Sequence, residues 1–176
     1  MKKELFNKEK GTINWDAYFM SLAKLSAMRS KDPLTKVGAC IVNKNNYVVS
    51  LGYNGMPTGV NISKKNNDDY FTWDRPENKE DIINSKYTYV VHAETNAIVN
   101  ANLTSSKIEE GSTLYVTHSP CYNCAKLIVQ SKIAKVIYCV AYKPECDDFK
   151  ASEKIFKTFG VETIKFQDFE LILKEK

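Results

Sequence analysis

The second half of the sequence alternates three times between a helical pattern and a short apolar run, and this alternation constrains the fold most. The predicted helices cover residues 92–102, 121–131 and 151–159, and the predicted strands cover residues 113–116, 135–140 and 161–166. Strands that are joined through helices become parallel neighbours in one sheet. The second half therefore predicts parallel strands with helices packed against them.

The first half predicts one helix and one hairpin. Apolar residues recur every three or four positions in residues 14–29, which is the period of an amphipathic helix. The β-rich runs 37–42 and 47–51 are separated by Asn43-Lys44-Asn45-Asn46, and asparagine tolerates the positive φ angles of turns. Together with the three later strands, the antiparallel hairpin predicts an α/β fold with a mixed five-stranded sheet.

Composition narrows the class of protein further. The 176 residues are 43% hydrophobic, which suits a single domain over residues 1–176, and a polar loop extends over about residues 54–87. Residues 1–10 lack the apolar core of a signal peptide, and no stretch approaches the ~18 apolar residues of a membrane helix. We therefore expect a soluble, cytoplasmic protein with no membrane partner. The net charge is +4 and its lysines are scattered among acids, so we expect no nucleic-acid partner either.

Two short motifs carry the chemistry, namely His92-Ala93-Glu94 and Pro120-Cys121-Tyr122-Asn123-Cys124. Zinc accepts one imidazole nitrogen and two thiolates, and a catalytic site leaves the fourth tetrahedral position to water. A C-x-x-C motif at a helix start lets both sulfurs converge on one ion, and the helix dipole favours their thiolate forms. The sequence predicts one catalytic Zn²⁺ per chain, bound by His92, Cys121 and Cys124.

Glu94 is the residue that indicates a catalytic rather than a structural metal site. It lies two positions after the histidine, so it can reach a water at the open position without being a ligand. Zinc makes hydroxide available near neutral pH, and a glutamate can move the protons of such a reaction. A purely structural zinc site would need a fourth protein ligand, and Cys146 and His118 are the candidates for it. In that case the protein would be a non-enzymatic zinc scaffold, which is the alternative to an enzyme. Cys40 and Cys139 lie in apolar runs and are predicted to be core thiols.

At these residues the chain resembles the cytidine deaminase superfamily, in which H-x-E and P-C-x-x-C form the zinc deaminase pattern. Within it, the chain closely resembles the group that acts on deoxycytidylate (dCMP). The resemblance also covers residues 30–33, 37–42, 89–98, 115–128 and the segment Gly52-Tyr53-Asn54-Gly55-Met56-Pro57. It implies a three-layer α/β/α cytidine-deaminase-like fold. The implied reaction is hydrolysis of dCMP to dUMP and ammonia, which supplies dUMP for thymidylate synthesis.

The resemblance also implies roles for individual residues. His92, Cys121 and Cys124 would bind zinc, and Glu94 would be the proton shuttle. Asn54 would contact the sugar 3′-hydroxyl, although asparagine is also a common turn residue. The backbone around Ala93 and Ser119 would contact the edge of the base.

A 5′-phosphate needs cations or hydroxyl donors, and Tyr142 and Lys143 follow a predicted strand at the end where ligands of α/β proteins bind. Lys36 is a further candidate, and each lysine is equally typical of a solvated surface charge. The resemblance implies a homohexamer that dCTP activates, with Mg²⁺ accompanying this effector, and that dTTP inhibits. Tyr53, Asn54 and Gly55 would form part of the effector site. Cytidine, dCTP or a base within nucleic acid are the alternative substrates.

Overall fold

The computed structural model describes residues 5–7, 9–58, 71, 73–75 and 81–175, so much of the predicted loop 54–87 lies outside the described residues. Its centre is a five-stranded sheet in the order β4-β3-β5-β6-β7. β3 (Gly38–Val42) pairs antiparallel with β4 (Val48–Tyr53) and with β5 (Thr113–His118). β6 (Lys135–Val140) runs parallel to β5 and to β7 (Glu162–Lys165). The mixed five-stranded sheet and its hairpin are confirmed.

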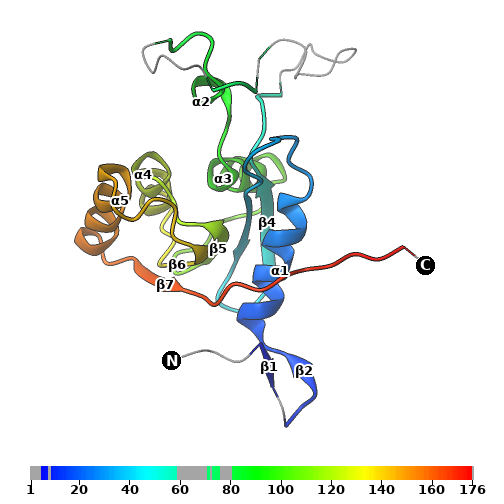
Figure 1. The fold of residues 1–176 in the computed structure, drawn as a ribbon. Helices are drawn as coiled ribbons and strands as arrows, with labels where there is room; N and C mark the ends of the chain where they lie inside the picture. Colours follow the sequence, from blue (N-terminus) through cyan, green and yellow to red (C-terminus); the bar gives the residue numbers. More distant parts are fainter. Residues whose placement is uncertain (1–4, 8, 59–70, 72, 76–80, 176) are drawn as a thin grey trace.

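Helices cover both faces of this sheet, as the three-layer prediction requires (Figure 1). α1 (Trp15–Ala27) lies on one face, and α3 (Ala93–Leu103), α4 (Tyr122–Gln130) and α5 (Asp147–Thr158) lie on the other. Side chains alternate along the strands between two apolar clusters because successive residues of a strand point to opposite faces. The α3–α5 side takes Ala39, Ile41, Leu114, Val116, Val136 and Tyr138, and the α1 side takes Cys40, Val42, Tyr115, Ile137 and Cys139.

Cys40 and Cys139 are both buried in the core, as predicted. Burial raises the pKa of the Cys40 thiol to about 12 and that of the Cys139 thiol to about 11, so both stay protonated near neutral pH. These two cysteines therefore act as core thiols and not as metal ligands.

Some boundaries differ from the sequence prediction. The last helix begins at Asp147 and not at residue 151, because Asp147 and Asp148 occupy its first turn, where negative charge is favourable. The helix α2 (Lys86–Tyr89) was not predicted, nor was the antiparallel pair β1 (Phe6–Asn7) and β2 (Thr12–Ile13). All three elements are too short to produce a periodic pattern.

Two strand glycines let helices approach the sheet closely. A Cβ atom at Gly38 would collide with the backbone of Ala23 and Ala27 in α1. A Cβ atom at Gly52 would collide with the backbone of Ala93 and Ala97 in α3. The start of α3 is therefore held against β4, just ahead of Asn54.

Two asparagines of α3 reach the edge strand β4. The Nδ2 group of Asn96 donates to the carbonyl oxygen of Tyr53, and that of Asn100 donates to the carbonyl oxygen of Leu51, both at 2.8 Å. Residues four apart lie on the same face of a helix, and carbonyl groups two apart point to the same side of a strand. Asn96 and Asn100 can therefore both donate to the outer side of β4. Side chains of the helix thus satisfy acceptors at the edge of the sheet.

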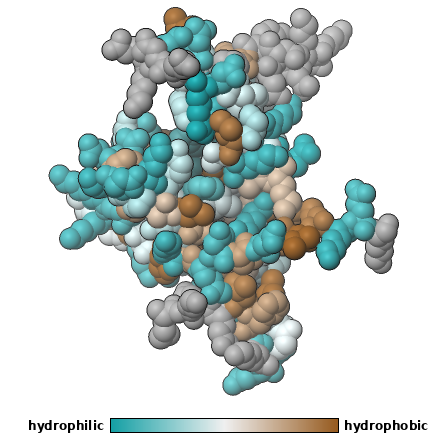
Figure 2. Space-filling model, in the orientation of Figure 1, coloured by the Kyte–Doolittle hydropathy of each residue, from teal (hydrophilic) through white to brown (hydrophobic). Residues whose placement is uncertain are grey.

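Apolar side chains are also found on the surface. Figure 2 shows apolar surface at several places, one of them in the lower part of the view. The exposed large apolar residues of β1, β2 and α1 are Phe6, Ile13, Trp15, Tyr18 and Leu25. A transmembrane helix is not found among the helices that the structure describes.

Candidate active site

The start of α3 and the start of α4 bring the two sequence motifs together. His92 is the N-cap residue of α3, and Cys121 is the N-cap residue of α4, which follows β5 after a short connection. Both residues have extended backbone angles, with φ −69° and ψ 155° at His92 and φ −76° and ψ 169° at Cys121. Cys124 lies in the first turn of α4. The positive ends of two helix dipoles therefore face the same point, which favours thiolates.

The three predicted ligands form one cluster. The Nδ1 atom of His92 lies 3.6 Å from the Sγ atom of Cys121 and 3.4 Å from the Sγ atom of Cys124. The three ligand atoms lie within 4.8 Å of one another, and this is the one group of at least three His, Cys, Asp or Glu residues found among the described residues. His118 and Cys146 are not members of it. One imidazole and two thiols fit a zinc ion that keeps its fourth position open.

Contacts within the cluster shift the pKa values of its members. The hydrogen bond with Cys121 raises the pKa of His92 to about 9, although burial opposes this shift. Hydrogen bonds from Cys124 and His92 lower the pKa of the Cys121 thiol to about 4, and the Cys121 contact together with burial raises that of Cys124. These shifts favour a thiolate at Cys121 beside a protonated imidazole at His92, and zinc binding requires that the ligands give up their protons.

Glu94 is buried beside the cluster, with 4% of its surface exposed. Burial raises the pKa of its carboxyl, while the neighbouring His92 and the thiol of Cys124 oppose the shift. A raised pKa allows a carboxyl group to bind and release protons near neutral pH. Glu94 therefore has the surroundings of a proton carrier.

Asn54 is buried but already partnered. Its Nδ2 group donates to the carbonyl oxygen of Thr35 at 2.9 Å, and its Oδ1 atom accepts from the backbone N–H of Val37 at 2.8 Å. The amide oxygen can accept a second hydrogen bond. Asn54 thus connects β4 to the segment that precedes β3, and its amide oxygen has the capacity to accept from a ligand as well.

The other predicted contact residues lie at the ends of strands. The hydroxyl of Ser119 accepts from the backbone N–H of Tyr142 at 2.9 Å, which connects the ends of β5 and β6. The Nζ atom of Lys143 lies 5.3 Å from the centre of the Tyr142 ring, and Lys36 is exposed. Ala93 is fully buried at the start of α3. Ser119 and Tyr142 are therefore brought together, whereas no contact among the described residues joins Lys36 to them.

Tyr53 and Gly55, which the resemblance places in an effector site, flank Asn54. Gly55 forms an antiparallel bridge with Val91, the residue directly before His92. Tyr53 is partly exposed at the end of the edge strand. The segment around Asn54 is therefore held next to the first metal ligand.

Comparisons with known proteins agree with this geometry. The sequence model of the family described as "Cytidine and deoxycytidylate deaminase zinc-binding region" matches residues 13–140. The chain belongs to this family. It is an α/β zinc-binding deaminase, and the matched region contains all four residues of the His92, Glu94, Cys121 and Cys124 constellation.

Individual relatives of this deaminase cover most of its length. The human protein named "Deoxycytidylate deaminase" is 46% identical over 155 residues, which are 88% of this chain and 80% of that protein. The Drosophila melanogaster protein named "Probable deoxycytidylate deaminase" is 42% identical, over 89% of this chain and 74% of its own length. The crystal structure of the dCMP deaminase from cyanophage S-TIM5 in complex with dCMP and dUMP has a TM-score of 0.64 and 30% identity, and covers 92% of this chain and 99% of that one.

One residue near the metal site of this deaminase was missed by sequence reasoning. The hydroxyl of Thr95 lies 3.8 Å from the Sγ atom of Cys124. The sequence position of Thr95 beside Glu94 does not predict this contact, because the rotation of α3 determines which of its side chains faces the sulfur of Cys124. Partners of this kind tune metal ligands.

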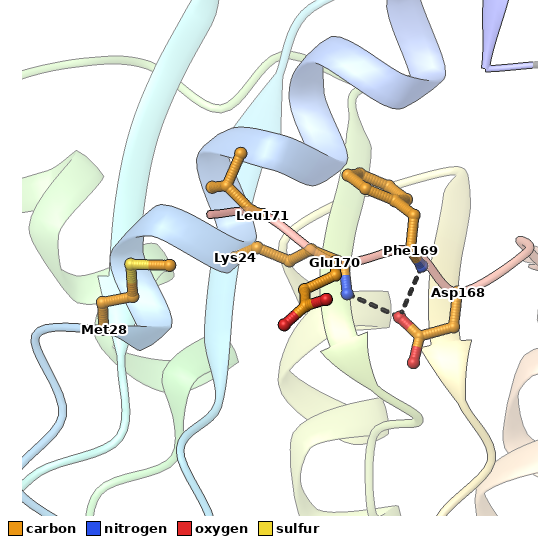
Figure 3. Close-up of a pocket in the computed structure, with 6 residues that line it drawn as sticks. All are labelled: Lys24, Met28, Asp168, Phe169, Glu170 and Leu171. Atoms are coloured by element: carbon orange, nitrogen blue, oxygen red, sulfur yellow. Dashed lines mark hydrogen bonds and ion pairs between the residues drawn. The ribbon is translucent and has the colours of Figure 1, made fainter. Parts of the chain in front are cut away.

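A shallow hollow lies between α1 and the segment that follows β7 (Figure 3). Its lining contains none of the predicted site residues and consists of Lys24, Met28, Asp168, Phe169, Glu170 and Leu171. The ammonium of Lys24 pairs with Asp168 at 2.5 Å and lies 4.9 Å from the centre of the Phe169 ring. These contacts fasten the C-terminal segment to α1, on the face of the sheet opposite α3 and α4.

Proposed function

We propose that this protein catalyses the hydrolytic deamination of dCMP to dUMP and ammonia, and so supplies dUMP for thymidylate synthesis. The observation that carries the proposal is the buried Glu94 carboxyl beside the His92, Cys121 and Cys124 cluster. The names of the relatives and the bound nucleotides of the cyanophage enzyme support dCMP as the substrate. We further propose that residues 1–176 form one deaminase domain in the cytoplasm.

The chain's own residues divide the reaction between them. His92, Cys121 and Cys124 would hold the zinc ion, which supplies a nucleophilic hydroxide near neutral pH by lowering the pKa of water. Glu94 would accept a proton from the attacking water and deliver it to the ring N3 atom; it would then accept the remaining proton of the added hydroxyl and deliver it to the amino group, which leaves as ammonia. Its burial excludes bulk water, so the proton passes between substrate and carboxyl.

The remaining residues would bind the nucleotide. We propose that the backbone at Ala93 and Ser119 contacts the base, that Asn54 accepts from the sugar 3′-hydroxyl, and that Tyr142, Lys143 and Lys36 serve the 5′-phosphate. The remaining acceptor capacity of the Asn54 amide supports its role, and the exposed ammonium groups of the two lysines are accessible to an anion.

Regulation and assembly belong to the same proposal. We propose a homohexamer without a nucleic-acid partner, activated by dCTP with Mg²⁺ and inhibited by dTTP, with Tyr53, Asn54 and Gly55 in the effector site. The exposed apolar side chains over β1, β2 and α1 support association between copies, because large apolar patches mark interaction surfaces.

A substrate panel tests the function. Ammonia release is measured with dCMP, dCTP, deoxycytidine, CMP and a cytosine-containing oligonucleotide, each with and without dCTP and Mg²⁺. We expect dCMP to be deaminated far faster than deoxycytidine, because the nucleoside lacks the phosphate. Equal rates for these two compounds would replace the proposal by a nucleoside deaminase, and a faster oligonucleotide would indicate a nucleic-acid editor. Metal analysis of the same preparation should give about one zinc per chain, since the site offers three ligands and an open position.

A further inference from the structure

A buried ion pair joins two distant parts of the chain. The Nζ atom of Lys86 lies 2.6 Å from the Oδ2 atom of Asp32, across 54 positions of sequence, and each side chain is 3% exposed. Desolvation of two buried charges often outweighs their attraction, and apolar replacements of such pairs are frequently neutral or stabilising. A gain in folding stability therefore does not by itself explain why this ion pair is buried. A buried pair can also fix the position of two chain segments relative to each other.

Asp32 organises the segment that holds Asn54. Its Oδ1 atom accepts from the backbone N–H groups of Leu34 at 2.9 Å and Thr35 at 3.1 Å. The backbone of Thr35 and Val37 in this segment hydrogen-bonds the Asn54 amide, whose Nδ2 group also lies 3.5 Å from the Oδ2 atom of Asp32. The position of Asn54 thus depends on the turn that the Asp32 carboxylate shapes.

Lys86, the partner of the Asp32 carboxylate, belongs to the segment that leads to the metal site. It is the first residue of α2, which stands above the layers of the sheet in Figure 1, and from which the chain descends into α3. Between these helices Val91 exchanges backbone hydrogen bonds of 2.9 and 3.1 Å with Gly55. The pair therefore connects the chain that leads to His92 with the segment before β3, whose backbone hydrogen-bonds Asn54.

We propose that the Asp32–Lys86 ion pair is a positioning device for the substrate, which sets the place of Asn54 and Gly55 relative to the metal site. This inference rests on the proposed function and deepens it by naming two residues that act through Asn54 without touching the nucleotide. Burial acts to raise the pKa of the Asp32 carboxyl, but hydrogen bonds from Lys86, Leu34 and Thr35 outweigh it and lower this pKa, so the carboxylate form is favoured.

The test compares Lys86→Met with Lys135→Met in steady-state kinetics with dCMP. Lys135 forms an ion pair of 2.9 Å with Glu162 between β6 and β7, but both side chains are exposed, so the control removes the same charge from the surface. We expect Lys86→Met to raise KM roughly tenfold or more, with kcat and zinc content close to the wild-type values. Hydrogen exchange should accelerate at the amides of Val37 and Val91. Lys135→Met should change none of these quantities.

The double variant Asp32→Asn/Lys86→Met covers the case in which the single variant does not fold. It leaves no unpaired buried charge, and the new amide oxygen at position 32 can still accept from Leu34 and Thr35. A raised KM in a folded variant supports the proposal. A normal KM, or a loss of zinc together with kcat, overturns it. A wild-type enzyme that does not deaminate dCMP overturns the proposed function instead, and the kinetic comparison is then made on whichever compound of the panel it deaminates.

Discussion

Two buried carboxyl groups of this protein have opposite surroundings. Glu94 is 4% exposed, and burial raises the pKa of its carboxyl. Asp32 is 2% exposed, and burial acts in the same direction there, but an ammonium and two backbone N–H groups outweigh it and lower the pKa. Hydrogen-bond and charge partners can therefore reverse the effect of burial on the pKa of an acid, and they help decide whether the acid moves protons or fixes structure.

The two carboxyl groups illustrate two different roles, proton transfer and the positioning of other residues. A proton carrier works best when its pKa lies near the working pH, and burial moves the pKa of a carboxyl toward that range. A positioning group needs a permanent charge and satisfied hydrogen bonds. Burial shifts the pKa of Glu94 in the direction of the first requirement, and the hydrogen bonds of Asp32 meet the second, so replacing each residue predicts a different result.

The largest effect is expected from Glu94→Gln. Glutamine has nearly the same shape but neither accepts the proton of water nor delivers one to N3. General acid–base groups contribute about 10²–10⁴-fold, and Glu94 would handle several transfers, so turnover should fall by at least roughly three orders of magnitude. Zinc content and calorimetric binding of dCMP should be unchanged, and Glu109→Gln at an exposed glutamate serves as the control. A variant that loses its zinc would make Glu94 a ligand or a structural support.

Asp32→Asn should instead act on stability. The change leaves the ammonium of Lys86 buried without its counter-ion, and breaking such pairs typically costs about 3–5 kcal/mol. We expect a loss near the lower limit, about 3 kcal/mol by the same principle, because asparagine can still accept from Leu34 and Thr35. Denaturant unfolding of the zinc-loaded protein measures this difference. Asp147→Asn, at a fully exposed aspartate, should change the midpoint little, and an equal loss there would remove the contrast.

The smallest effect concerns acid. A carboxyl whose pKa is lowered by folding contributes stability above its unfolded pKa of about 3.9 and loses this contribution as the pH falls through the folded value. The stability of the wild type should therefore decline below about pH 4 more steeply than that of Asp32→Asn/Lys86→Met, which lacks this carboxyl. Both proteins keep the same zinc ligands, so the difference between their unfolding free energies at pH 7, 5, 4 and 3 reports on Asp32. A constant difference would contradict the lowered pKa.

Sequence reasoning reached the sheet, its layers and the metal cluster because these depend on local patterns. Short apolar and β-rich runs predicted the main strands, helical patterns predicted the main helices, and the two motifs identified His92, Glu94, Cys121 and Cys124. The partner of Asp32 was not predictable in this way. Lys86 is one of many lysines in a polar stretch, and only the folded chain shows which ammonium meets a carboxylate 54 positions earlier.

The asparagines of α3 also have a consequence for how copies of this chain can associate. β4 is an edge strand, and an open edge is a template for adding a strand from another molecule, which leads to runaway fibres. Asn96 and Asn100 occupy the carbonyls of Tyr53 and Leu51 that an incoming strand would need. Addition of a strand from another molecule is therefore disfavoured at this edge, and association there is left to side-chain contacts.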